Sequence, residues 1–318
     1  MTHESSTHTI PPAKGDETVA AVVVTYNRKG LLCQCIGALL GQTRPLDAIY
    51  IIDNASTDGT DDTVSAQYGD RVIYERLPRN TGGAGGFHRG LKRAFEERHG
   101  WIWVMDDDAQ PTAQCLESLL KHAVTGVGFV APLICDRTGH PQSYHHKVSS
   151  KSTYSIWTSW SPAIVTDQLT PDYRIPIDAN AFVGPLINRD AIEAIGLPRS
   201  DYFILFDDHE YTYRVSRRFP SYLVPGATIF HFDVNNERTA KPYQTQWKTY
   251  YHFRNWIDFT KHNDGLLAAI LLTGKIIIGT TMKVGCGWYR NPIYSYRSYC
   301  LGAWHGLIGQ LHNDWGPT

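Results

Sequence analysis

The first part of the chain alternates between short apolar runs and amphipathic segments. The apolar runs are rich in β-branched residues and predict strands that are buried on both faces of a sheet. They cover residues 18–26, 48–56, 72–78 and 100–111, and the segments between them predict helices over residues 31–42, 61–69 and 91–98. Strands and helices that alternate this regularly are typical of an open, largely parallel and twisted α/β sheet with flanking helices, which is the fold class that we predict.

Beyond residue 135 the pattern is less regular. Residues 143–162 show weak periodicity and predict loop or edge structure, and residues 178–196 predict a strand followed by a helix that begins near residues 188–190. Three further elements are predicted: an apolar strand or turn that ends in acids and leads into a helix (202–220), a strand (222–233) and an aromatic-rich helix (245–262).

These patterns divide the chain into three parts. Residues 1–17 are polar, lack the apolar core of a secretory signal and predict a disordered leader. Residues 18–260 form the α/β domain, with a regular half (18–135) and a less regular half (136–260). Residues 261–318 predict an aromatic-rich, helical C-terminal region.

An apolar stretch in the last part raises the question of membrane contact. Residues 265–282 are mostly apolar but contain Lys275 and three glycines, so they are marginal for a spanning helix, which needs about 20 predominantly apolar residues. Lys283, Arg290 and several aromatic residues follow, as at a membrane interface. A core helix and an interfacial helix fit this pattern equally well, and a true span fits it less well.

Composition and charge narrow the range of functions. With 318 residues and 42% hydrophobic content, the chain can form one large domain or two modest ones. The formal net charge is −1 and there is no long basic run, which argues against nucleic acid as a partner. The six cysteines are scattered without the spacing of a zinc site, which suits the reducing cytoplasm.

Polar clusters follow all four predicted strands of the regular half. In open α/β sheets ligands bind beyond the carboxyl ends of the strands, so we expect the clusters to converge on one rim. The clusters are Thr25-Tyr26-Asn27-Arg28, Asp53-Asn54-Ala55-Ser56, Asn80 with the glycines after it, and Asp106-Asp107-Asp108.

The third cluster belongs to RNTGGAGGFHRG (79–90), which concentrates glycine before the helix predicted from Leu91. Glycine suits a position where no side chain can be tolerated, and a helix N-terminus favours an anionic group. A dinucleotide fingerprint would lie after the first strand, whereas this stretch follows the third. We therefore expect Gly82 and Gly83 to let a ligand approach the backbone, with Arg89 or the helix N-terminus facing its charge.

Two acidic clusters are candidates for catalysis. Asp106 and Asp108, at the end of an apolar strand, can reach one Mg²⁺ or Mn²⁺ that also holds a pyrophosphate, and the repulsion within residues 106–108 calls for a cation. One acid of residues 207–210 could serve as general base, unless the cluster only stabilises a helix N-terminus.

Asp53 and His231 each allow two interpretations. Asp53 either accepts hydrogen bonds from a uracil or ribose or caps the next turn. His231 lies within a predicted strand, where a lone histidine is usually a core residue, and it becomes functional only if it faces the metal.

The motifs VAAVVVTYNR, IIDNASTDGT, NTGGAGGFHRG and WVMDDDA together resemble glycosyltransferase family 2, inverting sugar-nucleotide transferases with the GT-A fold. The resemblance covers roughly residues 18–260. The NTGGAGGF variant with its triple aspartate is most similar to bacterial galactofuranosyltransferases, which use UDP-galactofuranose and Mg²⁺ or Mn²⁺ to build on lipid-linked glycans. The resemblance implies that residues 18–135 bind the nucleotide sugar and residues 136–260 the acceptor.

The resemblance also implies roles for single residues. Asp106 and Asp108 would bind the metal with His231 as a third ligand, and Asp208 would deprotonate the acceptor hydroxyl with Asp207 beside it. Arg254 lies in YYHFRN, which resembles a segment of rhamnosyltransferases, and would touch the donor phosphates. The other donor contacts that we expect are Thr25, Asn27, Arg28, Asp53, Asn80, Gly82, Gly83, Arg89 and Asp107.

The partners that the resemblance implies are a UDP-sugar and a glycan or polyprenyl-linked glycan acceptor. The location implied is the cytoplasm and, if the apolar stretch is interfacial, the inner face of the plasma membrane. A dTDP-rhamnose donor is the alternative within the family. A nucleotidyltransferase would carry its glycine-rich loop after the first strand, where this chain has TYNRKG. A non-catalytic nucleotide- or glycan-binding module would not need both acidic clusters.

Overall fold

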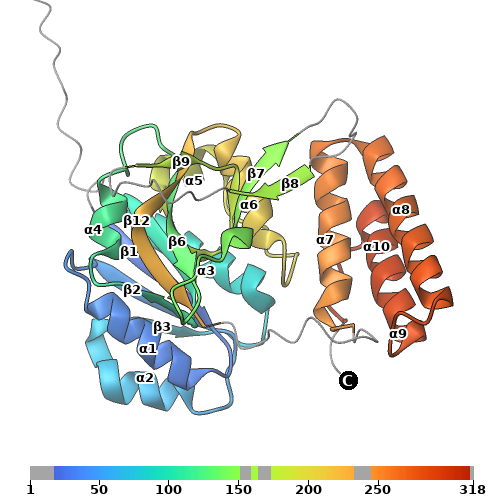
Figure 1. Ribbon diagram of the computed structural model, residues 1–318. Helices are drawn as coiled ribbons and strands as arrows, with labels where there is room; N and C mark the ends of the chain where they lie inside the picture. The colour runs from blue at the N-terminus through green and yellow to red at the C-terminus, as the bar shows by residue number, and fades with distance from the viewer. Residues whose placement is uncertain (1–17, 151–158, 164–172, 233–244, 316–318) are drawn as a thin grey trace, which may run out of the picture.

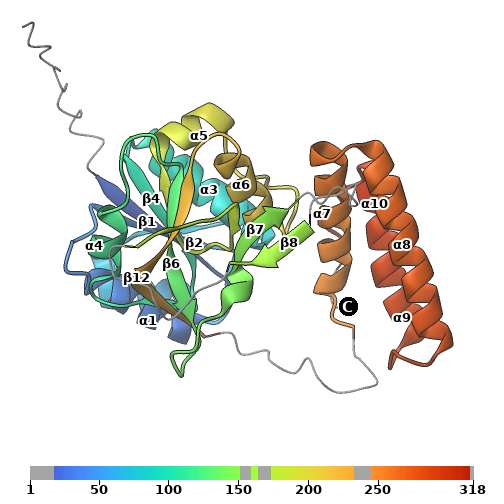
Figure 2. The ribbon, with the colours of Figure 1, turned by 45° about the horizontal axis from the view of Figure 1, so that its top comes forward.

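The computed structural model describes residues 18–150, 159–163, 173–232 and 245–315 (Figure 1). The leader predicted over residues 1–17 lies outside the described residues. Within them, an α/β part is built on a nine-stranded sheet, and a group of helices at the C-terminal end stands beside it (Figures 1 and 2).

The main sheet has the strand order β3-β2-β1-β4-β11-β6-β12-β5, and the short β9 pairs with β12. β1 is parallel to β2 and β4, β2 to β3 and β6 to β12, whereas β11 runs antiparallel between β4 and β6. The prediction of an open, largely parallel sheet is therefore confirmed. The strands are β1 (Val19–Thr25), β2 (Ala48–Asp53), β3 (Ile73–Arg76), β4 (Trp101–Asp106), β5 (Ala109–Pro111), β6 (Phe129–Cys135), β9 (Ile175–Pro176), β11 (Val183–Asn188) and β12 (Ser221–His231).

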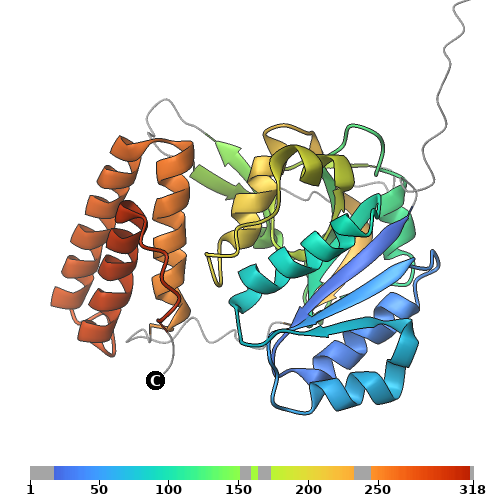
Figure 3. The same cartoon turned by 180° about the vertical axis from the view of Figure 1, so that it is seen from behind.

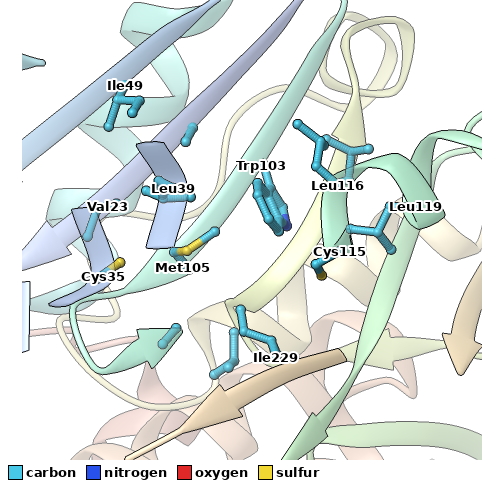
Figure 4. Packing of buried hydrophobic residues seen from close by; sticks show 14 of the residues in the cluster. Val23, Cys35, Leu39, Ile49, Trp103, Met105, Cys115, Leu116, Leu119 and Ile229 are labelled. Carbon is cyan, nitrogen blue, oxygen red and sulfur yellow. The ribbon is translucent and has the colours of Figure 1, made fainter. Parts of the chain in front are cut away.

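Both faces of this sheet are covered, which explains the continuous apolar runs. Residues 19, 21 and 23 of β1 belong to one core cluster with α1, α2 and α4, and residues 20, 22 and 24 belong to another with α3, α5 and α6. Figure 4 shows the first cluster, where Trp103 and Met105 of β4 lie near Leu39 and Leu116. The helices are α1 (Lys29–Leu40), α2 (Thr60–Tyr68), α3 (Gly82–Glu96), α4 (Cys115–Leu120), α5 (Arg189–Ile195) and α6 (Asp207–Ser216), with short 3₁₀ turns η1 (Gly69–Arg71) and η2 (Ser143–His145).

Helix α3 begins at Gly82, nine residues before the start that we predicted at Leu91. The prediction was wrong because glycine is a poor helix former, so the glycines did not indicate a helix. In the structure they belong to α3, and two of them face β1. A Cβ atom at Gly86 would lie 2.5 Å from Val24 Cγ1, and one at Gly90 would lie 2.3 Å from Val22 Cγ1. The glycines therefore let the helix pack directly on the strand, and this packing outweighs their low helix propensity.

The less regular half adds a small antiparallel sheet in the order β10-β7-β8 beside α6 (Figure 2). Its strands are β7 (His146–Ser150), β8 (Ser159–Pro162) and β10 (Ala179–Asn180). The predicted succession of strand and helix over residues 178–196 is confirmed by β11 and α5, where the Asn188 side chain accepts a 2.8 Å hydrogen bond from the Asp190 backbone N–H and caps the helix. Residues 202–206 form a turn that leads into α6.

The C-terminal helices pack on one another beside the α/β part (Figure 3). They are α7 (Lys248–Asn263), α8 (Leu266–Gly285), α9 (Pro292–Tyr296), a π-helical turn η3 (Arg297–Leu301) and α10 (Gly302–Ile308). The boundary that we predicted after residue 260 falls inside α7. Ile257 of α7 shares a core cluster with Ala269, Leu272 and Ala303, so α7 belongs to the C-terminal helical group as well.

Candidate active site

A cavity of about 810 Å³ opens beyond the carboxyl ends of β1 and β4, between the first turns of α3 and α6 and the side of α7. Each of the four polar clusters contributes to its lining, through Thr25, Asn54, Asn80 and Asp106 among others, so the predicted convergence on one rim is confirmed. The expected site residues that line the cavity are Thr25, Arg28, Asn80, Gly82, Gly83, Asp106, Asp107, Asp108, Asp207, Asp208 and His231.

Asp107 is tied to the end of β1. The Thr25 hydroxyl donates a 2.7 Å hydrogen bond to one carboxylate oxygen of Asp107, and Arg28 lies 3.3 Å from the other. Burial raises the pKa of Asp107 to about 6, although these two partners favour the charged form. Arg28 also contacts Asp108 at 2.9 Å, so one guanidinium spans two neighbouring carboxylates at the cavity wall.

Asp108 and His231 meet because β12 pairs with β5 just after the acidic turn, with His231 opposite Ala109. His231 Nε2 lies 3.3 Å from Asp108 Oδ1, a buried oxygen that accepts no hydrogen bond of ordinary geometry within the described chain. Burial and the nearby Asp108 and Asp107 raise the pKa of Asp106 to about 8. Burial opposes ionisation of Asp108 too, but His231 and Arg28 hold its pKa below the usual value.

These residues have the chemistry of a divalent cation site, although they are not preassembled as one. In the part of the chain that the structure describes, no three His, Cys, Asp or Glu side chains are already grouped around a point that could hold a metal ion. Two carboxylates and an imidazole nevertheless face one cavity. A cation there would supply a partner for the Asp108 oxygen and would favour the charged form of Asp106, whose pKa is high. The donor set therefore fits Mn²⁺ or Mg²⁺.

Asp207 and Asp208 occupy the first turn of α6, so the two side chains point in different directions around the helix axis. Burial, followed by the charge of Asp208, raises the pKa of Asp207 well above its ordinary value. Asp208 Oδ1 accepts hydrogen bonds from the backbone N–H of His209 at 2.6 Å and its ring Nδ1 at 2.9 Å. Despite burial, this partner keeps the pKa of Asp208 low. Both acids line the cavity.

Two residues at the strand ends that we expected to contact the sugar donor form hydrogen bonds within the protein instead. Asp53 is fully buried and accepts hydrogen bonds from the Ser56 backbone N–H at 2.9 Å and the Tyr74 hydroxyl at 2.5 Å. Asn27 Oδ1 accepts a 2.7 Å hydrogen bond from the backbone N–H of Thr57. Neither lines the cavity, and the turn-capping interpretation describes Asp53 in this structure.

Two expected arginine contacts also lie away from the cavity lining. Arg89 forms a 2.5 Å ion pair with Glu75 on the side of α3. Arg254 is 0% exposed and donates to the backbone carbonyls of Asp201 and Tyr202, at 3.1 and 2.8 Å. The prediction that Arg254 touches donor phosphates is therefore not supported by its place in the fold, because its guanidinium is fully buried and used by the backbone.

The glycines at the cavity serve two different purposes. A Cβ at Gly82, where φ is +73°, would lie 2.0 Å from the Phe203 carbonyl oxygen, so this glycine is required by the turn before α6. A Cβ at Gly85 would lie 2.3 Å from the Thr81 hydroxyl. At Gly83 the nearest atom would be Phe87 Cε2 at 4.0 Å, so only there does the missing side chain face open space at the cavity.

Sequence reasoning missed an aromatic wall of the cavity. Lys248, His252 and Trp256 line it from one face of α7, and their spacing of four residues is a helical signal that the sequence contains. Trp160 of β8 and Lys147 of β7 complete this wall from segments that carry no clear periodicity. The cavity thus has an acidic side and an aromatic side.

Comparisons with known proteins bear on this site. Residues 20–196 match Glycosyl transferase family 2. The galactofuranosyltransferase GlfT1 of Mycolicibacterium smegmatis (strain ATCC 700084 / mc(2)155) is 31% identical over 204 residues, which cover 63% of this chain and 66% of that protein. The galactofuranosyltransferase GlfT2 of Mycobacterium tuberculosis (strain ATCC 25618 / H37Rv) is 24% identical over 314 residues, 88% of this chain and 47% of that protein. The chain thus spans slightly less than two thirds of the first relative and about half of the second.

Solved structures with the same arrangement share little sequence with this chain. The crystal structure of GalNAc-T7 with UDP, GalNAc and Mn²⁺ superimposes with a TM-score of 0.57 at 13% identity, over 78% of this chain and 48% of that one. The crystal structure of S. aureus TarS 1-349 has a TM-score of 0.55 at 12% identity, over 92% of this chain and 82% of that one. At such identities the likeness concerns the fold alone.

Proposed function

The chain belongs to glycosyl transferase family 2, and from that premise we propose that it is an inverting, metal-dependent transferase that moves galactofuranose from UDP-galactofuranose to a hydroxyl of a lipid-linked glycan. The family assignment, the GT-A-type α/β fold and the class of enzyme agree with what the sequence resemblance implied. The donor sugar is proposed from the names of the related galactofuranosyltransferases. One observation carries the mechanism: both acidic groups, residues 106–108 and 207–208, line the same cavity.

On the donor side, Asp106, Asp108 and His231 would hold Mn²⁺ or Mg²⁺. A divalent cation bound there would neutralise the donor diphosphate and stabilise UDP as it leaves. The chain supplies the rest of this side from its own groups. Arg28 can turn from the carboxylates toward phosphate oxygens, and Gly83 in the first turn of α3 brings its backbone N–H to the cavity lining.

On the acceptor side, we propose that Asp208 is the general base and that Asp207 helps to bind the acceptor. The low pKa of Asp208 keeps it ionised near neutral pH, so it can take a proton, whereas Asp207 with its raised pKa can donate a hydrogen bond. As Asp208 takes the proton of the acceptor hydroxyl, the acceptor oxygen bonds to the anomeric carbon from the face opposite UDP. The bond from that carbon to UDP breaks in the same step, and its electron pair leaves on UDP.

The aromatic wall supports a glycan as the acceptor. Trp160 and Trp256 offer ring faces on which the apolar face of a sugar can pack, and Lys147 and Lys248 offer cationic groups for a phosphate of a lipid-linked acceptor. Burial lowers the pKa of Lys147, although the nearby Asp208 favours its charged form.

The outer face of α8 supports a position on the inner face of the plasma membrane. The helix has 20 residues, and only 28% of its apolar stretch is buried inside the protein. It lies on the side of the C-terminal group away from the sheet (Figures 1 and 3). Lys283 lies in its last turn and Trp288 follows its end, as expected for an interfacial helix rather than a core helix. Its most exposed apolar side chains are Leu266, Leu267, Ile270, Leu271, Ile278 and Met282, all at least 46% exposed.

A donor screen tests the proposal. UDP-galactofuranose, UDP-galactopyranose, UDP-glucose and dTDP-rhamnose are each offered with a synthetic or lipid-linked glycan acceptor, with Mn²⁺ and after treatment with EDTA. We expect transfer only from UDP-galactofuranose, its loss in EDTA and its return with Mn²⁺ or Mg²⁺. Transfer from dTDP-rhamnose would replace the donor assignment, full activity of the metal-stripped enzyme would remove the metal, and binding of a UDP-sugar without turnover would indicate a non-catalytic module.

A further inference from the structure

The turn that leads into the second acidic cluster has an unusual backbone. Phe203, Leu205 and Phe206 have φ values of 63°, 64° and 73°, in the left-handed region that residues with a side chain seldom adopt. Phe206 is also the N-cap of α6, so the turn determines where Asp207 and Asp208 begin. Such a conformation persists only where the surrounding structure holds it.

The hydrogen bonds that hold this turn come from two helices. Asn255 Nδ2 of α7 donates to the carbonyls of residues 202, 204 and 205, at 3.0, 3.2 and 2.7 Å. Arg254 donates to the carbonyls of residues 201 and 202, at 3.1 and 2.8 Å. From the other side, the backbone N–H of Ala84 in α3 donates to the carbonyl of residue 203 at 3.1 Å. Every carbonyl from residue 201 to residue 205 therefore accepts a hydrogen bond.

Arg254 is in turn held by the segment that follows α10. One guanidinium nitrogen of Arg254 donates to the backbone carbonyl of His312 and to Asn313 Oδ1, at 3.3 Å for the latter. The ring of Trp315 stacks on Tyr250 of α7, with ring centroids 4.7 Å apart and planes 17° apart. Residues 310–315 thus run back along α7 to the buried arginine (Figure 3).

Two glycines of α10 allow this helix to pack closely on α7, which places the segment after α10 beside Arg254. A Cβ at Gly302 would lie 2.5 Å from the Tyr250 carbonyl oxygen, and one at Gly306 would lie 2.2 Å from that of Arg254. Helix α10 therefore rests directly on the backbone of α7, one turn after another. The contacts form a continuous path from α10 through Arg254 and Asn255 to the turn.

We infer that Arg254, Asn255 and residues 310–315 are positioning residues that hold the strained turn 203–206 and thereby place Asp207 and Asp208 at the cavity. The catalytic consequence rests on the function proposed above, whereas the stabilisation of the turn by these residues does not. No residue of this path lines the cavity except the turn itself and the two acids. Loss of the path should consequently impair the chemical step and leave the donor side unchanged.

Hydrogen exchange measures the hold on the turn without any need for activity. The variants are Asn255→Ala and a chain that ends at Gln310, with Asn263→Ala as the matched control, since Asn263 lies on α7 and its side chain donates to the Phe259 carbonyl of the same helix. Because each lost hydrogen bond weakens local stability, amides of residues 203–210 should exchange at least about tenfold faster in both variants. The control should leave them near the wild-type rate. Wild-type exchange of residues 203–210 in Asn255→Ala and in the shortened chain would overturn the inference.

Kinetics test the consequence for the acids. Asn255→Ala and the shortened chain should lose about 10²-fold in kcat, as expected for a misplaced catalytic group, while UDP affinity stays within about twofold of wild type. In an Asp208→Asn background, Asn255→Ala should cost no further rate, because the group that it positions is already absent. A full second loss there would refute the positioning role. If Asn255→Ala fails to fold, the shortened chain provides the same test. If the wild type transfers no sugar, the proposed function is rejected, and hydrogen exchange still tests whether these residues stabilise the turn.

Discussion

Two glycines in the first two turns of α3 form a matched pair in which alanine should change stability in opposite directions. A Cβ at Gly83 would have no neighbour nearer than 4.0 Å and would face the cavity. A Cβ at Gly86 would lie 2.5 Å from Val24 Cγ1 and 3.1 Å from Asn54 Nδ2, inside the packed contact with β1. The two substitutions are chemically identical, so only their surroundings differ.

The geometry gives the size of each effect. Alanine in place of glycine stabilises a helix by about 0.5–1 kcal/mol, and Gly83→Ala should raise the free energy of unfolding by that amount. Gly86→Ala has the same helical gain but overpacks a core contact, and a Cβ only 2.5 Å from Val24 Cγ1 belongs in the upper part of the usual overpacking cost, about 2–3 kcal/mol. The net loss is then about 1–2.5 kcal/mol. At about 2–4 °C per kcal/mol for a large domain, the Tm should rise by about 1–4 °C in the first variant and fall by about 2–10 °C in the second.

Thermal unfolding without ligand and calorimetric titration with UDP-galactofuranose and Mn²⁺ separate the two roles. The added methyl group of Gly83→Ala enters the space that we assign to the donor diphosphate, so affinity should fall about tenfold while the Tm rises. Gly86→Ala should bind the donor nearly as well as wild type below its own Tm. A lower Tm with unchanged donor affinity in Gly83→Ala would refute the assignment of this glycine to the donor side, and a higher Tm in Gly86→Ala would refute the packing argument.

Three further predictions concern the base, the pH dependence of stability and the membrane. Asp208→Asn should lose about 10²–10⁴ in kcat with UDP binding and Tm near wild type; if Asp207→Asn is instead the inactive variant, the base is Asp207. Burial lowers the pKa of His146 to about 4, although the hydrogen bond to Asn180 favours the charged form. Because an unfolded histidine binds its proton near pH 6.5, the stability present above pH 6.5 should be lost as the pH falls toward 4. Chemical unfolding at pH 7, 6, 5 and 4 should show this decline and a shallower one in His146→Gln; equal slopes would exclude His146 as its source. The protein should sediment with anionic liposomes in a salt-sensitive way, and a variant with Leu267→Glu and Ile278→Glu on α8 should stay in the supernatant, while sedimentation of both proteins alike would assign the membrane contact elsewhere or to none.

Periodicity and side-chain chemistry along the chain are sufficient to predict the α/β sheet and the edge at which the site lies. A strand buried on both faces needs apolar side chains at every position, so β1, β2 and β4 are visible as continuous runs without any knowledge of their neighbours. Parallel strands place their carboxyl ends on one side, and the polar clusters that follow these runs therefore had to share a rim. This is why Thr25, Asn80 and residues 106–108 could be assigned to one site from sequence alone.

The polar groups that remain available to a ligand could not be predicted, because contacts between distant segments determine them. Asp53 and Arg254 have the right chemistry for a donor, but their hydrogen bonds are made within the fold, to Tyr74 and to the backbone before α6. The start of α3 was likewise hidden, because it depends on a strand that lies about 60 residues earlier in the chain rather than on helix propensity. Local sequence reports periodicity and side-chain chemistry, whereas the partners of a side chain come from distant segments that only folding brings together.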